Sequence, residues 1–298
     1  MFDIIDLGFQ GEPAIIASYV FRGAHGVALV ETGPASTYGN LLAGLRALGI
    51  QPSDVKDILV THIHLDHAGA AGWLARETGA TVHVHHVGAP HLAEPERLLA
   101  SAARIYGDQM GPLWGETVAV PAGQVHALED GDMVEAAGLR FRALDTPGHA
   151  YHHMAYLVNG LCFSGDVAGV RLPGQSHVRL PTPPPEIDLP AWHRSVARLR
   201  DLKPDSLLPT HFGPIGGDAL THLQTVDDAL DAVADFVRAR RQAGQDRAEI
   251  IAGYTAWVAA LAREDGADDE WVHRYEVIVP SDMCVDGLAR YLGKASLV

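Results

Sequence analysis

The 298-residue chain is poor in cysteine, in basic side chains and in long apolar runs. Its two cysteines, Cys162 and Cys284, lie far apart and outside any CxxC pair. This excludes a disulfide framework and a thiolate zinc site, and it favours a reducing compartment. The opening MFDIIDLGFQGEP is acidic where a signal peptide needs basic residues, and no apolar run reaches the ~18 residues of a membrane span. We therefore expect a soluble, cytoplasmic protein without a membrane partner.

Positive charge is the second shortage. The chain has 22 lysines and arginines against 37 aspartates and glutamates, which gives a formal net charge of −15. Such a chain repels a phosphate backbone, so we expect a small-molecule substrate and no nucleic acid partner. A hydrophobic content of 47% excludes a disordered chain. The composition is compatible with a homo-oligomer. Histidine, with 17 copies, is unusually frequent.

Apolar periodicity predicts alternating strands and helices, which is typical of the α/β class. The expected strands are residues 14–21, 27–31, 57–61, 81–86, 139–144, 155–158, 161–164 and 206–208. The expected helices are residues 38–48, 68–77, 92–110 and 191–202, and the pattern is again helical from Asp218 onward. Residues 167–190 form a long connection containing PTPPPEIDLP, too rich in proline for a helix or a central strand. Such a connection is typical of a lid or a pocket wall.

Three histidines and an aspartate lie within six residues, in THIHLDH directly after the strand predicted at 57–61. Alternate side chains of an extended segment point the same way, so His62 and His64 can bind one ion. Asp66 and His67 come where the chain turns into a helix and can serve a second ion. Imidazole nitrogen and carboxylate oxygen suit zinc, and three protein ligands per ion leave a position open for water.

Three further fragments carry the same chemistry at strand ends. They are Thr146–His149 (TPGH), Phe163–Asp166 (FSGD) and Pro209–Gly213 (PTHFG). Because each fragment lies where the chain leaves a strand, all of them can meet the HxHxDH segment at one edge of a sheet. The spaced set is much more specific for a metal centre than a lone His-x-His would be.

In order and spacing these four fragments resemble the motifs of the metallo-β-lactamase superfamily, over about residues 14–216. The family motifs are HxHxDH, a later His after a Gly, an Asp after an apolar strand, and a final His. The resemblance implies an αββα sandwich of two mixed sheets with outer helices in residues 1–216. We expect residues 217–298 to form a helical extension packed on it. Glu31 stands where the family usually has Asp, which makes its supporting role less certain.

The resemblance also implies a complete binuclear ligand set. The first ion would be bound by His62, His64 and His149, the second by Asp66, His67 and His211, and Asp166 would bridge both. We expect two divalent ions, with Zn²⁺ preferred and Mn²⁺ or Fe compatible with the same donors.

Two cations about 3.5–4 Å apart lower the pKa of a shared water towards ~7. A metal-bridging hydroxide could then attack the carbonyl of a small ester, thioester or lactone, and Asp66 could carry a proton to the leaving group. The expected function is therefore a binuclear metal-dependent hydrolase.

Other histidines are weaker candidates for metal ligands. His83, His85 and His86 alternate, as on the polar face of a strand, and we interpret them as structural. His153 follows His149 by four residues, where the glyoxalase II branch has the last His of GHxxGH. We expect it to hydrogen-bond to a metal ligand.

Some side chains could contact the substrate. Tyr106 could face an acyl or aromatic group, although its helical spacing with Met110 and Trp114 is also typical of a core. Arg171, His177 and Arg179 in the proline-rich connection could bind a substrate carboxylate, or they could form a solvated loop.

Alternatives remain open within the family. Acyl-homoserine lactonases have a Tyr shortly after the position of Asp166, where this chain has Val167-Ala168-Gly169, and the basic glutathione-binding pattern of glyoxalase II is not recognisable. A different class is a persulfide dioxygenase-like oxidoreductase, in which a single iron would be held by the residues matching His62, His149 and Asp166. A phosphodiesterase is disfavoured by the acidic chain.

Overall fold

The computed structural model describes residues 1–216 and 218–295. The chain divides into two compact units: Met1–Asp145 with His152–Gly165 (unit 1), and Thr146–Tyr151 with Asp166–Val298 (unit 2). The predicted domain boundary falls at residue 217, outside the described residues, and stays a prediction. Within the described ranges, no helix has the length and apolarity needed to cross a membrane.

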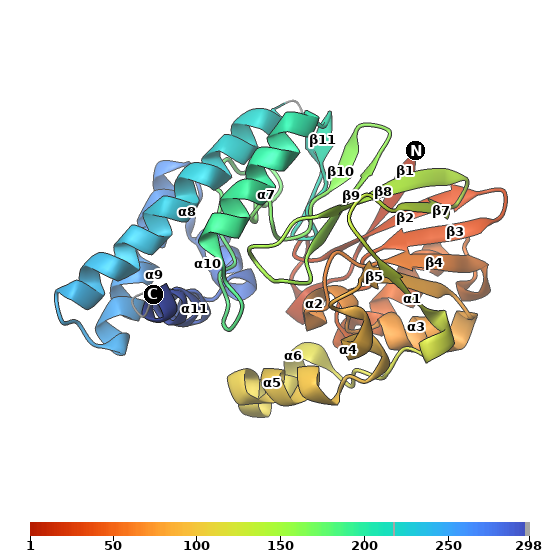
Figure 1. The fold of residues 1–298 in the computed structure, drawn as a ribbon, viewed down its shortest axis with the longest axis horizontal. Coiled ribbons are helices and arrows are strands. Elements are labelled where there is room, and N and C mark those ends of the chain that lie inside the picture. Colours follow the sequence, from red (N-terminus) through yellow and green to blue (C-terminus); the bar gives the residue numbers. More distant parts are fainter. Residues whose placement is uncertain (217, 296–298) are drawn as a thin grey trace. The chain divides into compact units, whose positions relative to one another are not determined.

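A six-stranded mixed sheet forms the first layer of unit 1, and Figure 1 shows most of it in red and orange. Its strands are β1 (Phe2–Asp6), β2 (Ala17–Gly23), β3 (Gly26–Val30), β4 (Val55–Leu59), β5 (Thr81–His85) and β6 (Val125–Leu128). Strands β1 to β3 pair antiparallel, and β3 to β6 pair parallel. Strand β3, with the sequence GVALV, is almost entirely buried, as is typical of a parallel strand that is covered on both faces.

The second layer of unit 1 is an antiparallel set of strands. It consists of β7 (Met133–Ala136), β8 (Leu139–Asp145), β9 (Met154–Val158) and β10 (Leu161–Phe163). Phe21 of the first layer meets Phe141 and Phe163 of the second, with ring centroids 5.2 and 5.5 Å apart in edge-on geometry. Each such pair contributes about 0.5–1.5 kcal/mol beyond the area it buries.

Tyr156 of β9 also joins the two layers. Its hydroxyl lies 3.0 Å from the carbonyl oxygen of Val60, directly after β4, and 3.2 Å from that of His83 in the middle of β5. The strand end that leads into the HxHxDH segment is therefore fixed by the neighbouring layer.

The helices of unit 1 are α1 (Tyr38–Ala47), α2 (Leu65–Ala68), α3 (Ala71–Thr78), α4 (Ala89–Ala93), α5 (Glu96–Tyr106) and α6 (Met110–Trp114). The continuous helix expected over 92–110 is wrong, because α4 ends before Pro95 and a second break follows at Gly107, whose φ is +50°. Strands β1, β6 and β7 were not predicted either, since each is short and only partly buried.

Unit 2 is mostly helical. It contains α7 (Leu189–Leu202), the short paired strands β11 (Ser206–Leu207) and β12 (Ile215–Gly216), and α8 (Ala219–Gln242), α9 (Arg247–Glu264), α10 (Asp269–Ile278) and α11 (Ser281–Ala295). An aspartate caps each of the helices α7 to α10 by accepting a backbone N–H of the first turn. Each such cap contributes typically ~1 kcal/mol.

The proline-rich connection is folded onto these helices rather than left in solvent. Val170 and Arg179 form an antiparallel bridge, and the Tyr275 hydroxyl of α10 donates to the carbonyl oxygen of His177. Two sheets with flanking helices, followed by a helical carboxyl-terminal region, confirm the predicted α/β class and sandwich architecture.

Candidate metal centre

The HxHxDH segment of unit 1 runs from the end of β4 into the short helix α2, as its sequence predicts. The carbonyl oxygen of His67 accepts the backbone N–H groups of Thr32 and Gly33 at 3.0 and 3.1 Å. The Thr32 hydroxyl donates to the same oxygen at 3.0 Å. The loop after β3 therefore fixes the backbone of the segment.

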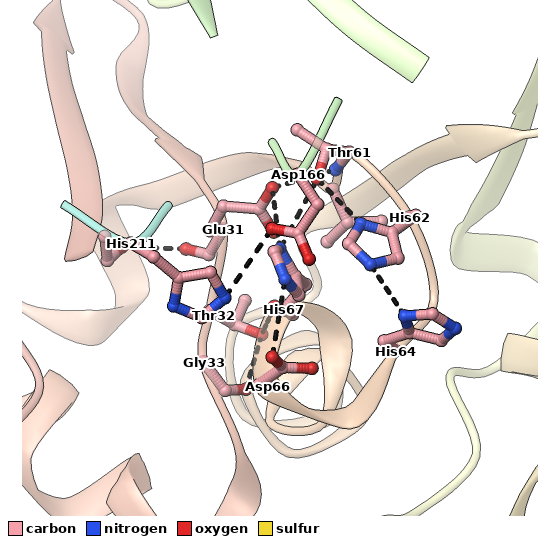
Figure 2. Close-up of polar contacts among 12 residues, drawn as sticks. Glu31, Thr32, Gly33, Thr61, His62, His64, Asp66, His67, Asp166 and His211 are labelled. Carbon is pink, nitrogen blue, oxygen red and sulfur yellow. Dashed lines mark hydrogen bonds and ion pairs between the residues drawn. The ribbon is translucent and has the colours of Figure 1, made fainter. Parts of the chain in front are cut away.

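His62 and His64 form a first pair of donors. The Nε2 atom of His62 lies 2.9 Å from the Nδ1 atom of His64, and Figure 2 shows these two nitrogens turned toward each other. His62 is fully buried, whereas His64 is partly exposed. Two converging imidazole nitrogens of this kind suit a zinc-like cation.

Asp66 and His67 form a second pair on the same segment. The Nε2 atom of His67 lies 3.5 Å from the Oδ2 atom of Asp66 (Figure 2). Asp66 keeps a side-chain exposure of 23%, whereas His67 is fully buried. Unit 1 thus brings His62 close to His64 and Asp66 close to His67. Their division between two ions stays a prediction.

Thr61 and Glu31 support both pairs from behind. The Thr61 hydroxyl lies 3.1 Å from Nδ1 of His62 and 3.5 Å from Nδ1 of His67. The Glu31 Oε1 atom accepts the Thr61 N–H at 3.1 Å and lies 3.5 Å from the same His67 nitrogen. These contacts occupy the outer nitrogens, so Nε2 of each ring is directed to its donor pair.

His152 and His153 lie on the other side of His62. The His153 ring is fully buried with its centroid 5.1 Å from that of His62, and the His152 ring stacks on His62 at 6.0 Å. Gly165 has φ +49°, and a Cβ there would come within 2.6 Å of both His153 Nε2 and Thr61 Oγ1. A glycine is therefore required directly before Asp166. The predicted hydrogen bond from His153 to a ligand stays a prediction.

In unit 2, His149 is oriented by the proline-rich connection. Its Nδ1 atom lies 2.8 Å from the carbonyl oxygen of Pro181. Because a carbonyl oxygen only accepts, Nδ1 carries the proton and Nε2 carries the lone pair that a metal ligand needs.

Asp166 lies between two imidazoles of unit 2 and offers a different oxygen to each. Its Oδ2 atom lies 3.4 Å from Nε2 of His149, and its Oδ1 atom lies 3.6 Å from Nε2 of His211. The Asp166 side chain is only 4% exposed. A buried carboxylate with a histidine beside each oxygen is suited to bridging two cations.

Trp192 of α7 holds the backbone around both His149 and Asp166. Its indole Nε1 donates to the carbonyl oxygen of Val167 at 2.7 Å, and its ring meets the His149 ring edge-on at 5.7 Å. Gly148 has φ +143°, and a Cβ there would lie 2.4 Å from the Cα atom of Trp192. Only glycine allows α7 to pack this closely.

His222 of α8 gives a second support, because its Nε2 donates to the carbonyl oxygen of Ala168 at 2.8 Å. Burial lowers the pKa of His222 to about 4, although the hydrogen bond to Ala168 acts in the opposite direction. The imidazole is therefore neutral at pH 7.

The side chains predicted to contact substrate are placed as follows. Tyr106, on α5, packs edge-on against Trp114 with ring centroids 5.0 Å apart. In unit 2, Arg171 donates to the carbonyl oxygen of Gln175. His177 and Arg179 are buried and pair with Asp265 and Glu276. Their contact with a substrate stays a prediction.

The VHVHH strand has partners of its own. His83 lies 2.9 Å from Asp57, and His85 lies 3.2 Å from Asp145. His86 lies 3.0 Å from Glu129 on the surface. These ion-pair contacts support the structural interpretation of all three histidines.

Sequence reasoning did not single out Thr61, Trp192 or His222. Thr61 had a usable signal, because it directly precedes the first ligand of the motif. Trp192 and His222 had none, since each is one residue of an ordinary amphipathic helix and each bonds to a backbone carbonyl near the site.

Known proteins similar to this chain agree with the fold. A metallo-β-lactamase fold-containing protein of Sulfurisphaera tokodaii is 30% identical over 204 residues, which are 67% of this chain and 74% of that protein. A solved metallo-β-lactamase family protein of Thermus thermophilus superposes with a TM-score of 0.67 at 25% identity, covering 99% of this chain and 94% of that one.

A hydroxyacylglutathione hydrolase of Aeromonas hydrophila is 29% identical over 198 residues, which are 66% of this chain and 61% of that enzyme. The chain spans about half to three fifths of the length of the hydroxyacylglutathione hydrolases that it matches. The family model of the metallo-β-lactamase superfamily matches residues 11–211. This range is more than half of the chain and includes every predicted metal ligand, so the chain belongs to the metallo-β-lactamase superfamily of metal-dependent hydrolases.

Proposed function

We propose that the chain is a binuclear metallo-hydrolase that cleaves a small carbonyl compound. This proposal rests on one observation: unit 1 has two pairs of candidate donors, and unit 2 has two histidines that could each complete one pair. Unit 1 presents the pairs His62/His64 and Asp66/His67, and unit 2 presents two histidines, one beside each oxygen of Asp166.

In the proposed centre each pair of unit 1 is completed by one histidine of unit 2. The first ion would be held by His62, His64 and His149, the second by Asp66, His67 and His211, and Asp166 would be shared between them. All donors are imidazole nitrogens or carboxylate oxygens, which bind Zn²⁺, Mn²⁺ and Fe. Zn²⁺ is the proposed ion, because imidazole and carboxylate are its usual ligands and catalytic zinc sites keep a position open for water or substrate.

Bound divalent cations would supply an activated water and would polarise the substrate carbonyl. The protein's own contribution is positional and acid–base. Thr61 and Glu31 fix the rings of His62 and His67, and Pro181 fixes that of His149. Asp66 keeps a side-chain exposure of 23%, so its carboxylate can also pass a proton to a leaving group.

The substrate proposed first is a thioester. Several relatives carry the name hydroxyacylglutathione hydrolase, and an acylglutathione is a thioester. The family match ends at residue 211, so helices α8 to α11 lie outside it and can give this chain a selectivity of its own. Esters and lactones of similar size belong to the same proposal. The unpaired, buried Cys162 and Cys284 agree with the expected cytoplasmic location.

The metal content tests the centre directly. Protein purified without added metal is analysed by inductively coupled plasma mass spectrometry, and two equivalents per chain are expected. Asp166→Asn should lower this number, whereas Asp57→Asn, which alters the ion pair with His83, should leave it unchanged. A single iron per chain in the wild type would contradict the binuclear proposal.

A substrate panel tests the reaction. The metal-loaded enzyme is assayed with a hydroxyacylglutathione, an aryl ester, a lactone and glutathione persulfide. Hydrolysis of at least one carbonyl compound is expected, with near-complete loss in Asp66→Asn at retained folding. Oxygen consumption with the persulfide, without hydrolysis of the others, would support the persulfide dioxygenase alternative instead.

A further inference from the structure

Unit 1 contains a further pair of facing histidines, His83 and His126, outside the HxHxDH segment. They lie opposite each other on the parallel strands β5 and β6. Their Nδ1 atoms are 2.9 Å apart, and their rings meet at 72° with centroids 5.1 Å apart. Neither residue is a proposed donor of the candidate metal centre, so the pair is a separate feature of the molecule.

The geometry of this pair closely matches that of the proposed donors His62 and His64. In that pair the facing nitrogens are also 2.9 Å apart, and the rings meet at 77° with centroids 4.5 Å apart. Two nitrogens bound to one zinc-like ion at the usual length of about 2.0–2.1 Å lie about 3 Å apart when they subtend a right angle at the ion. The separation of the Nδ1 atoms of His83 and His126 therefore allows one ion to bind both rings.

Asp57 of β4 orients the His83 ring. Asp57 pairs with Thr81, and His83 comes two residues later, so Asp57 and His83 share one face of the sheet. The Oδ1 atom of Asp57 lies 2.9 Å from the Nε2 atom of His83. Because a carboxylate oxygen only accepts, Nε2 carries a proton, and Nδ1 of the neutral ring carries the lone pair that faces His126. A metal-ligating histidine usually donates its other N–H to a carboxylate or a carbonyl oxygen in this way.

The pair is open to solvent on the side of His126. The side chains of His83 and Asp57 are 7% and 19% exposed, whereas His126 is exposed. Within residues 1–216 and 218–295, His83 is the only polar side-chain partner of His126. An ion can therefore reach the pair, and water can complete its coordination. The proton between the two Nδ1 atoms would then move, by exchange with water, to Nε2 of His126, so both rings stay neutral.

The donors select a transition-metal ion. Imidazole nitrogens suit Zn²⁺, Cu²⁺ and Ni²⁺, whereas Mg²⁺ and Ca²⁺ prefer oxygen ligands. The carboxylate of Asp57 adds a negative charge behind His83, which favours a cation over an anion. The pair has fewer donors than either ion of the proposed centre, so it binds more weakly and fills only when metal is added. The metal content expected for protein purified without added metal is therefore unaffected.

We propose that His83 and His126 bind one divalent transition-metal ion across β5 and β6, and that Asp57 orients His83 for this purpose. The ion joins β6, the edge strand of the first sheet, to its neighbour. The ion pair with Asp57 uses only the Nε2 atom of His83, so its structural role and the metal site are compatible. This site goes beyond the proposed hydrolase function and does not depend on it.

The test is isothermal titration calorimetry of the full-length protein with Zn²⁺. The wild type should bind one equivalent of Zn²⁺ more than His126→Gln, which removes one donor at an exposed position. Because the readout is a difference between two proteins, it holds whatever number of ions the catalytic centre takes. Excess Mg²⁺ should not compete for this equivalent. Equal stoichiometry and equal affinities in the wild type and the folded variant would overturn the proposal.

Three further variants test the assignment of the residues. Asp57→Ala removes the acceptor for His83 and should weaken binding of the additional ion by ~10–100-fold. Asp57→Asn keeps an acceptor oxygen and should lose less. The matched control is His86→Gln, an exposed histidine beside Glu129, which should keep the full stoichiometry. Circular dichroism verifies folding of each variant. Loss of the same equivalent in His86→Gln would show unspecific binding to surface histidines and would contradict the assignment.

Discussion

His149 donates its Nδ1 proton to the carbonyl oxygen of Pro181, 2.8 Å away. This contact sets the tautomer of a proposed metal ligand, and it comes from the proline-rich connection at 167–190. The proline-rich connection therefore orients the imidazole of His149. Its rigidity is useful here, because a fixed φ at each proline holds the carbonyl in place.

Trp192→Phe should weaken metal binding. The substitution keeps an aromatic ring beside His149 but removes the N–H that donates to the Val167 carbonyl. Loss of a group that orients a ligand typically costs ~10–100-fold in metal affinity or activity. Competition with a zinc-binding chromophore measures the affinity. Trp73→Phe, which loses a similar bond to Glu116 at the surface, should stay within twofold of the wild type. Equal losses in both variants would show a general effect on folding.

Thr61→Val should have a comparable effect on the other side of the proposed centre. Valine has nearly the same shape, but it leaves the Nδ1 atoms of His62 and His67 without the hydroxyl they share. We expect ~10–100-fold weaker metal binding, together with a loss of about 1–3 kcal/mol in the free energy of unfolding of the metal-free protein. Chemical denaturation measures the second quantity. The control is Thr255→Val in α9, whose hydroxyl bonds only to the Ile251 carbonyl. If the two threonine variants bind metal equally well, the role of Thr61 is wrong.

Gly148→Ala should destabilise the protein and lower its metal content. A Cβ at φ +143° would lie 2.4 Å from Trp192, so either the loop before His149 or helix α7 must move. We expect a loss of about 1–3 kcal/mol or more in the free energy of unfolding. Gly39→Ala is the matched control, because residue 39 lies in α1 with open space around it. That change should be neutral or stabilise by up to ~1 kcal/mol. A Gly148→Ala variant with unchanged melting temperature and metal content would refute the packing argument.

The free energy of unfolding of the metal-free protein should decrease as the pH is lowered, and part of this decrease should come from His222. Its pKa is about 4 in the folded state because of burial, against 6.5 for the ordinary side chain. Between these values the unfolded chain binds the proton more strongly, so the free energy of unfolding decreases as the pH falls from 6.5 to 4.

His222→Gln keeps an N–H donor for the Ala168 carbonyl but cannot titrate. The wild type should therefore lose about 2 kcal/mol more than this variant between pH 7 and pH 5. Urea denaturation in the presence of EDTA measures both curves. If the free energy of unfolding changes with pH equally in the wild type and the variant, His222 has the same pKa in the folded and the unfolded chain.

The sequence determined the chemistry of the site. Alternation in an extended segment predicts that His62 and His64 lie together, and these two side chains are in contact in the structure. The strand ends before TPGH, FSGD and PTHFG could be found because each fragment follows a short segment rich in apolar residues. The family followed from the order and spacing of these motifs, and the family match confirms it.

Only the tertiary structure decided what surrounds these donors. Trp192 and His222 lie on helices whose apolar periodicity says nothing about which carbonyl an indole or imidazole will reach. His177 and Arg179 lie in a segment with no pattern, and their burial depends on the partners Asp265 and Glu276, about 90 residues further along the chain. Local sequence fixes which groups are present and which way a strand or helix turns them. Long-range packing decides their neighbours, because such contacts join residues that no local pattern connects.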